Sequence, residues 1–471
     1  MEGNSSDPLG DSPVRRRIAR IDLQGDFQPW TVGFKDSRGQ GFELKPLEPM
    51  NPRPPELIFT EFMHFDLIVI GMGLSGLMAA KTAIEMGKKV LIVGKGLGTL
   101  SILSNSIDVL GVPPEAVKMK DGLSQWIEDH PDHPYGKTGL IKIEEALSSF
   151  NSFFPPPYAF QSRNETNSLV PTGAGTLRPT YLIPSTMMKG ITLREKKALV
   201  IGFKGYKDFY AHRLVDSFKC RGITLSLSET LQQEMTATAL ARWMEQAAFR
   251  ERIASEIREK INDETLIGFP AVLGMNDPMG VKKDLEKKTG ASIFEIPVLP
   301  PSIPGMRVFN RFMARLIQKG VTFLLGRSVS KTLLKGKRCE GIEVLHPPVV
   351  NAFSADRYIL ATGRFIGGGL KTDREKIFEP LFGLPIVQPS CRQEWFQKTF
   401  FSDSSHPIHH AGIFIDSSFR PVDEGGKLLL ENVWIAGTIL AHHECIQEKS
   451  REGIEIATGY MAAKQTFDVY K

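Results

Sequence analysis

The sequence predicts an α/β protein with a Rossmann-like domain, into which a second α/β or α+β domain is inserted. Two observations support this fold class. A hydrophobic strand, Phe65–Ile70, runs into a glycine turn and a helix, and a second strand, Lys89–Val93, follows the helix. Two later strands, Tyr358–Leu360 and Val433–Ala436, also end in glycine turns, and a long region of different pattern separates them from the first unit.

The first 63 residues differ in composition from the rest of the chain. They contain 8 of the 31 prolines and show no sustained apolar periodicity. We therefore expect residues 1–63 to be a disordered N-terminal extension, with at most a strand near Trp30–Phe34. No apolar segment of the signal-peptide kind is visible there. Met63 directly precedes the first strand and could be the true start of the protein.

The region between the first and second glycine turns predicts the inserted domain. It contains helical patterns at Leu231–Asn262 and Pro304–Lys319, a buried strand at Ala198–Phe203, and proline-rich links such as PVLPPSIPG. We expect residues 64–124 and 321–471 to form the Rossmann-like domain and residues 125–320 to form the insertion.

The composition argues against several classes of function. The 58 basic and 53 acidic residues leave a net charge of +5, which is too small and too dispersed to predict nucleic-acid binding. A dense basic run between Arg15 and Arg20 could meet a membrane surface or an acidic partner, or remain a solvated tail. The longest nearly apolar run, Leu67–Ala80, has 14 residues and ends at Lys81, so we expect no direct membrane span.

The first glycine turn has the pattern G-x-G-x-x-G in an informative context, after a strand and at the start of a helix. Gly71 permits the tight turn, Gly73 lets the backbone approach a phosphate, and Gly76 lets helix and strand pack closely. Free N–H groups and the positive end of the helix favour an anion. We expect this turn, including Leu74 and Ser75, to bind the phosphate of a cofactor.

Two acidic residues typical of adenosine- or flavin-binding units are missing. The second strand of such a unit normally ends in an acid that holds the ribose of an adenosine, and here it ends in Gly94. Lys95 could pair with a 2′-phosphate or point to solvent. In the third unit Gly437 is followed by Thr438, where FAD proteins often place an acid. A smaller phosphate-bearing cofactor therefore fits the sequence better than FAD.

Other polar residues remain open to two interpretations. Ser104 and Asn105 could contact the phosphate or ring of the cofactor, or cap a polar turn. Three arginines could bind a phosphate or be surface charges, namely Arg178, Arg307 and Arg311. Gly363 and Gly437, in the second and third glycine turns, are expected to face the cofactor.

Cysteines and histidines do not predict a metal site. No two cysteines have C-x-x-C spacing, which argues against zinc or an iron–sulfur cluster held by this chain alone, and we expect free thiols in a reducing cytoplasm. Pro407 disfavours a continuous helix through His406 and His410. His442 and Glu444 form H-x-E, but no P-C-x-x-C follows. Half of the histidines gather late in the chain, at His406, His409, His410, His442 and His443.

A series of segments in a fixed order resembles a known family. The segments are FDLIVIGMGLSGLMAA, SILSNSIDVLG, GTLRPTYLIP, ALVIGFKGYKDFYAHRL, GFPAVLG, PVLPPSIPGMR, ILATGRFIGGGL and FEPLFGLPI. Together, over residues 64–460, they are similar to the B subunit of bacterial anaerobic glycerol-3-phosphate dehydrogenase. The chain departs from that family in residues 1–63 and in AHHECIQEKSREG, which is more polar than the family pattern.

The resemblance implies a flavoprotein fold of the FAD/NAD(P)-binding type and a role in a three-subunit complex. Such a complex oxidises sn-glycerol 3-phosphate to dihydroxyacetone phosphate and passes electrons towards a membrane quinone. The A subunit is a catalytic FAD protein and the C subunit is an iron–sulfur membrane anchor. The B subunit is assigned FMN, which has no adenosine and so agrees with Gly94.

The resemblance also sets expectations for this chain. It would relay electrons at the inner face of the cell membrane, cytoplasmic and peripheral through its partner subunits. We assign no catalytic acid or base, and we expect a late histidine or Arg451 near the flavin ring. Two alternatives remain: a self-sufficient NAD(P)H-dependent oxidoreductase with FAD, or a structural subunit that has lost its flavin.

Overall fold

The computed structural model describes residues 63–468, apart from residues 105, 227–233, 347–348 and 403. The expected N-terminal extension, the strand near Trp30–Phe34 and the basic run lie outside the described residues, apart from Met63 itself, which begins the first strand. All of the described residues belong to one compact unit. In this part of the chain, no helix combines the length and the apolarity that a membrane span requires.

The main sheet joins the three strand–turn units that are far apart in the sequence. Its strands, in spatial order, are β11 (Thr322–Leu325), β2 (Val90–Gly94), β1 (Met63–Ile70), β14 (Val349–Leu360), β13 (Arg338–His346) and β12 (Ser328–Lys335), with β19 (Val433–Ile435) also paired to β14. β1 runs parallel to β2 and β14, and β14 runs parallel to β19. The buried faces of these strands explain their continuous apolar runs.

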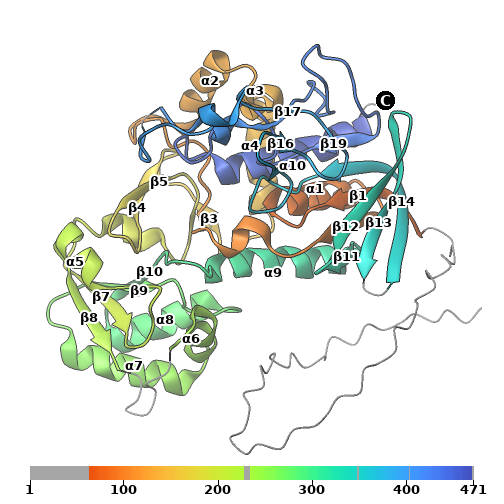
Figure 1. The fold of residues 1–471 in the computed structure, drawn as a ribbon. Coiled ribbons are helices and arrows are strands. Elements are labelled where there is room, and N and C mark those ends of the chain that lie inside the picture. Colours follow the sequence, from red (N-terminus) through yellow and green to blue (C-terminus); the bar gives the residue numbers. More distant parts are fainter. Residues whose placement is uncertain (1–62, 105, 227–233, 347–348, 403, 469–471) are drawn as a thin grey trace, which may run out of the picture. The chain divides into compact units, whose positions relative to one another are not determined.

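Two helices lie side by side against the main sheet, α1 (Leu74–Glu85) and α10 (Arg451–Asp468) (Figure 1). Two contacts show that they run parallel. Gly459, in the middle of α10, packs against the backbone of Ser75 at the start of α1. Nζ of Lys88, just after the end of α1, lies 5.0 Å from the ring of Phe467 near the end of α10. α10 therefore extends beyond the start of α1, past the glycine turn.

Further helices complete the first hydrophobic core. These are α2 (Met119–Asp129), α3 (Pro134–Thr138), α4 (Leu140–Asn151) and α9 (Ile303–Gln318). Ser302 is the N-cap of α9, and its hydroxyl accepts a hydrogen bond from the Gly305 N–H. Pro304 occupies the first turn of this helix. Short two-stranded pairs lie outside the large sheets: β3 (Phe160–Gln161) with β6 (Ile183–Pro184), β4 (Ser168–Pro171) with β5 (Leu177–Thr180), β15 (Lys371–Thr372) with β16 (Ile377–Phe378), and β17 (Ile386–Val387) with β18 (Gly412–Ile413).

A second, all-parallel sheet has its own hydrophobic core. Its order is β10 (Ser292–Ile296), β9 (Leu266–Pro270), β7 (Ala198–Phe203) and β8 (Arg221–Leu225). The helices of this part are α5 (His212–Phe218), α6 (Ala237–Met244), α7 (Ala247–Lys260) and α8 (Pro278–Thr289). The second core contains residues between Leu193 and Ile303. The expected insertion, residues 125–320, also includes α3, α4 and α9, but α3, α4 and most of α9 pack in the first core. The α/β fold class predicted from the sequence is confirmed.

Candidate functional site

A cavity of about 910 Å³ opens where the three strand–turn units meet. The parallel register places Ile70 of β1 beside Leu360 of β14, and Leu360 beside Ile435 of β19. The turn after each strand therefore lies at the same edge of the sheet, which is where open parallel sheets bind ligands. The cavity continues along the end of β2, the start of β12 and the segment that precedes α10.

The glycines of the first turn have different surroundings. A Cβ on Gly71, whose φ is +122°, would lie 2.2 Å from the carbonyl oxygen of Ala361. A Cβ on Gly76 would lie 2.0 Å from the carbonyl oxygen of Gly71, so helix and turn are in close contact there. A Cβ on Gly73 would meet nothing within 4 Å, and Gly73 lines the cavity. An anion can therefore approach the backbone at Gly73, where the N–H groups of the first helical turn have no acceptor within the helix.

The end of β2 has no room for the missing acid. A Cβ on Gly94 would lie 2.8 Å from Cγ of Met72, a residue of the glycine turn. Lys95 follows and lines the cavity. Among the described residues, the carboxylates that line this cavity are Glu444, in the segment before α10, and Glu455, in α10 itself. Neither is on β2, where a ribose-binding acid is normally found.

The second unit contributes a glycine turn and an arginine. Gly363 has a φ of +67° and lines the cavity, as does Arg364. The part-buried guanidinium of Arg364 donates to the carbonyl oxygens of His409, Leu440 and His443, and to Nδ1 of His443 at 2.8 Å. Burial lowers the pKa of Arg364 to about 10, so it remains charged at neutral pH. Arg364 fixes two chain segments that border the cavity.

The third unit is held against both helices. Gly437 has a φ of +85°, and a Cβ there would lie 2.4 Å from Oγ of Ser75. Its N–H donates to Oγ1 of Thr458 at 2.8 Å. Gly437 therefore serves close packing between the end of β19 and helices α1 and α10, while the next residue, Thr438, lines the cavity.

The N-terminus of α10 forms the other end of the cavity. Arg451 lies eight residues before Gly459, the residue that packs on Ser75, so it lies about 12 Å further along the helix axis. Its positive charge adds to that of the helix terminus. Glu455, one turn further along, accepts a hydrogen bond from Thr99 at 3.3 Å. Burial raises the pKa of Glu455 to about 7, against the opposing effect of Arg451.

The remaining predicted residues are placed as follows. Ser75 lines the cavity, whereas Leu74 is buried below it. The hydroxyl of Ser104 lies 3.2 Å from that of Ser106, and the cavity lining near it comes from Thr99 and Ser101. Asn105 lies outside the described residues.

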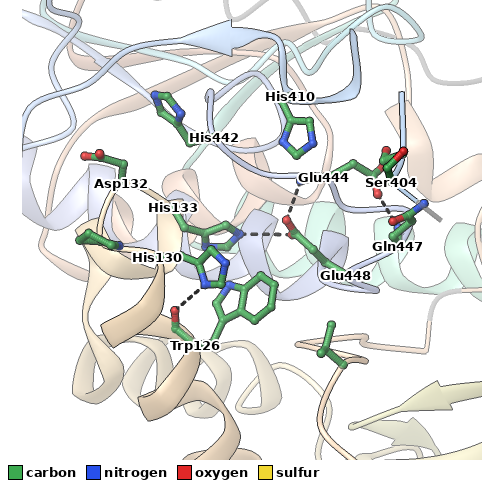
Figure 2. Close-up of a pocket in the computed structure, with 13 residues that line it drawn as sticks. Trp126, His130, Asp132, His133, Ser404, His410, His442, Glu444, Gln447 and Glu448 are labelled. Atoms are coloured by element: carbon green, nitrogen blue, oxygen red, sulfur yellow. Dashed lines mark hydrogen bonds and ion pairs between the residues drawn. The ribbon is translucent and has the colours of Figure 1, made fainter. Parts of the chain in front are cut away.

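A second pocket, of about 720 Å³, adjoins the first cavity. Figure 2 shows its histidines converging from three segments: His130 and His133 after α2, His410 before β18, and His442 after β19. The Tyr135 N–H donates to Nδ1 of His133, so Nε2 carries the proton that His133 donates to Glu448 at 3.2 Å. Glu444 lines both this pocket and the larger cavity.

The histidines do not assemble a metal centre in the described residues. No group of three or more His, Cys, Asp or Glu side chains is arranged there to hold an ion. Residues Pro407–His410 form a short 3₁₀ turn. The rings of His406 and His409 are 5.4 Å apart, and His443 is engaged by Arg364.

Comparison with known proteins agrees with this geometry. A family profile described as FAD binding domain matches residues 66–449. The probable B subunit of anaerobic glycerol-3-phosphate dehydrogenase from Halobacterium salinarum is 31% identical over 418 residues, covering 84% of this chain and 96% of that protein. The corresponding B subunit from Vibrio cholerae is 28% identical over 430 residues, covering 87% and 98%. The chain belongs to this B-subunit family.

Membership of this family makes the chain a flavoprotein oxidoreductase, as the sequence predicted. Among solved structures, a 3-ketosteroid Δ1-dehydrogenase from Sterolibacterium denitrificans is 10% identical, covers 86% of this chain and 99% of its own, and has a TM-score of 0.41.

The arginines suggested as phosphate ligands have other partners in this family member. Arg178 forms an ion pair with buried Asp108. Arg307 is buried and paired with Glu295, and Nε of Arg311 donates to a backbone carbonyl. Arg307 was expected to be a phosphate ligand or a surface charge. Both interpretations were wrong, because Arg307 is buried and its guanidinium is paired with Glu295 of β10. Arg364 and Glu455 were missed as cavity residues; for Arg364, its place directly after the second glycine turn was the available signal. His409, which lines the cavity, is one of the late histidines named from the sequence.

Proposed function

We propose that this chain is the flavoprotein subunit of a quinone-linked anaerobic sn-glycerol-3-phosphate dehydrogenase complex. It relays electrons from oxidation of glycerol 3-phosphate, which yields dihydroxyacetone phosphate, towards a membrane quinone. The observation that carries the proposal is the cavity that runs from the open glycine turn to the N-terminus of α10, in a chain whose relatives are named as subunits of this dehydrogenase.

The proposed cofactor is FMN. The absence of a ribose-binding acid supports it, since Gly94 takes that place and a side chain there would collide with Met72. FAD is the alternative, because the cavity also extends along Arg327–Ser330 and Leu345, beyond the end of β2. Both flavins carry the phosphate that the open side of Gly73 and the start of α1 can bind.

The residues of the cavity fit a flavin in other respects. Thr438 and the positive end of α10, with Arg451, line the cavity, where the positive charge would favour an electron-rich group. The flavin, when bound, supplies the electron transfer. The chain itself holds the ring, sets the charge around it and limits its contact with water.

The proposed partners are the FAD-containing catalytic A subunit and the iron–sulfur C subunit that anchors the complex to the membrane. The chain is proposed to lie on the cytoplasmic side, peripheral at the inner face of the cell membrane through these partners. The modest net charge of +5 supports no role in nucleic-acid binding.

The test begins with the purified chain. Denaturation followed by chromatography identifies the released flavin and its amount per chain. FMN close to one per chain supports the proposal; FAD would favour the alternative of a self-sufficient NAD(P)H-dependent oxidoreductase. No flavin, even after incubation with FMN and FAD, would favour a purely structural role in the complex.

The relay role needs a second measurement. Co-expression with the two proposed partners should give a complex in which glycerol 3-phosphate reduces the flavin of this chain and then a quinone analogue. A complex that reduces the quinone at an unchanged rate when this chain lacks flavin would contradict the relay.

A further inference from the structure

One histidine lies in the wall between the cavity and the second pocket. His409 lines the larger cavity, its neighbour His410 lines the second pocket, and Glu444 lines both. His409 is held in place from its own backbone, because Arg364 donates to its carbonyl oxygen.

The contacts of His409 define which nitrogen carries the proton. Nδ1 lies 3.3 Å from Oε1 of Glu444. The carboxylate of Glu444 accepts the N–H groups of Ile446, at 3.2 Å, and Gln447, at 2.7 Å, so it is fixed in the acceptor form. A carboxylate can only accept, so its negative charge beside Nδ1 favours the tautomer of His409 that carries the proton on Nδ1. Ser405 Oγ, 3.3 Å from the same nitrogen, can accept from it too.

This arrangement leaves Nε2 of His409 as a free base. Within the described residues, the two polar contacts of the His409 ring, the hydrogen bond with Ser405 and the ion pair with Glu444, both involve Nδ1. Burial lowers the pKa of His409 below its ordinary value, with Glu444 acting in the opposite direction and His406, Arg364 and His410 acting with burial. A neutral imidazole whose Nδ1 lies beside a buried carboxylate has its Nε2 available to accept a proton.

We propose that His409 exchanges the flavin's redox proton with the second pocket. The proposal rests on the flavin-binding part of the proposed function. A flavin bound in the cavity that passed two electrons to the next carrier of the complex would also release one proton, and Nε2 of His409 would accept that proton. The proton on Nδ1 moves to Glu444, and from there to water in the second pocket. Reduction of the bound flavin would run the same proton transfers backwards, so the imidazole of His409 need not rotate.

The second pocket has the features that such an exit requires. It is open to solvent and lined by side chains that bind water, among them His130, Asp132 and His410, all of which are exposed (Figure 2). Glu448, also in its lining, is already bound by His133, Ser450 and the Glu444 N–H. Glu444 is the carboxylate common to both linings, so it is the group through which the proton can cross.

The first experiment follows flavin and proton together. The flavin-loaded chain is reduced anaerobically by light with a deazaflavin and EDTA, then mixed with an excess of a ferricenium acceptor in weak buffer containing a pH indicator. Wild type should release its proton in step with flavin oxidation. His409→Gln should slow both by about a hundredfold, which is the usual contribution of a positioned acid–base group. Because burial lowers the pKa of His409, the wild-type rate should fall only at pH values below the ordinary histidine pKa of about 6.5, and this fall should be absent in the variant.

Matched variants separate proton transfer from structure. Glu444→Gln should slow proton release while the flavin stays bound. His409→Ala should recover with added imidazole, which can enter through the second pocket. His212→Gln, at an exposed histidine of α5 outside both linings, should behave as wild type.

A measurement on flavin-free protein tests the contact between His409 and Glu444. In flavin-free protein labelled at histidine Cδ2, the ¹³C shift that disappears in His409→Gln should report the Nδ1–H form, and should change in Glu444→Gln. Full flavin occupancy with unchanged kinetics in His409→Gln would overturn this inference alone. A wild-type chain that binds no flavin would overturn the proposed cofactor and this inference together.

Discussion

The three glycines of the first turn have two kinds of surroundings. Gly71 and Gly76 are required by the protein's own packing, since a Cβ at either would lie within 2.2 Å of a carbonyl oxygen. Gly73 is not, because the space in front of it is empty. The pattern G-x-G-x-x-G thus combines two glycines that the packing requires with one that leaves open space beside the backbone.

This difference predicts opposite outcomes for two alanine variants. Gly73→Ala should keep the stability of the flavin-free protein within about 0.5 kcal/mol, as for substitutions that meet no neighbour, but should weaken flavin binding. Gly76→Ala should destabilise the flavin-free protein by about 1–3 kcal/mol, because the extra methyl group overpacks the turn. Urea unfolding and flavin titration measure the two effects. Equal flavin affinity in Gly73→Ala and wild type would exclude a phosphate at this turn.

Among the elements, α9 connects the two hydrophobic cores. Its apolar residues Val308 and Phe312 pack in the first core, while Arg307 reaches the end of the second sheet. There Arg307 makes two bonds of 2.7 Å with Glu295 of β10, and Nε donates to the Gly274 carbonyl at 2.8 Å. Glu295 also accepts the Leu273 N–H at 2.8 Å. The pair therefore ties α9, β10 and the loop after β9 together.

Breaking this pair should be costly. Arg307→Met should destabilise the protein by about 3–5 kcal/mol, because it leaves the fully buried Glu295 carboxylate without its counter-charge. Adding Glu295→Gln should recover most of the loss, since the amide oxygen still accepts the Leu273 N–H without a charge. Urea unfolding of both variants checks this. A single variant as stable as wild type would show that the ion pair contributes little.

The molecule as a whole carries several buried carboxyl groups near the cavity. Burial raises the pKa of Glu455 to about 7, and burial together with Glu452 raises the pKa of Asp108 above its usual range. A raised carboxyl pKa means that the folded protein keeps a proton that the unfolded chain releases. The stability contributed by such a group is present below about pH 4.5, the unfolded value, and is lost as the pH rises to about 7.

This linkage predicts that the difference in free energy of unfolding between wild type and Glu455→Gln depends on pH. In flavin-free protein, wild type should lose stability relative to the variant as pH rises from about 4.5 to about 7, at about 1.4 kcal/mol per unit of pKa shift. Above that range the difference should stay constant. Urea unfolding at pH 4.5, 6 and 8 measures it. Burial raises the pKa of Glu448, but its hydrogen bonds and the charge of His133 outweigh burial and leave that pKa lowered. Wild type should therefore lose stability relative to Glu448→Gln as the pH falls below about 4.5, so this variant needs urea unfolding below pH 4.5 as well.

Local patterns were sufficient to predict the units that build the site. The strand–turn–helix at Phe65–Ile70 and the strands ending at Gly363 and Gly437 could be read from the sequence, because apolar runs and glycine positions are set by neighbouring residues. Parallel pairing then brings the three turns to one edge of the sheet. Gly94 was likewise visible as a missing acid, but the contact with Met72 that excludes a side chain was not.

The partners of charged groups depended on the folded chain. Arg178 and Asp108 are 70 residues apart, Arg307 near the start of α9 meets Glu295 of β10, and His409 meets Glu444 of the segment before α10. A charge pattern in sequence does not specify which distant group will neutralise it, since burial and pairing arise together when the cores pack. The glycine turns follow from local chain geometry, whereas the proton path and the buried ion pairs follow from long-range packing.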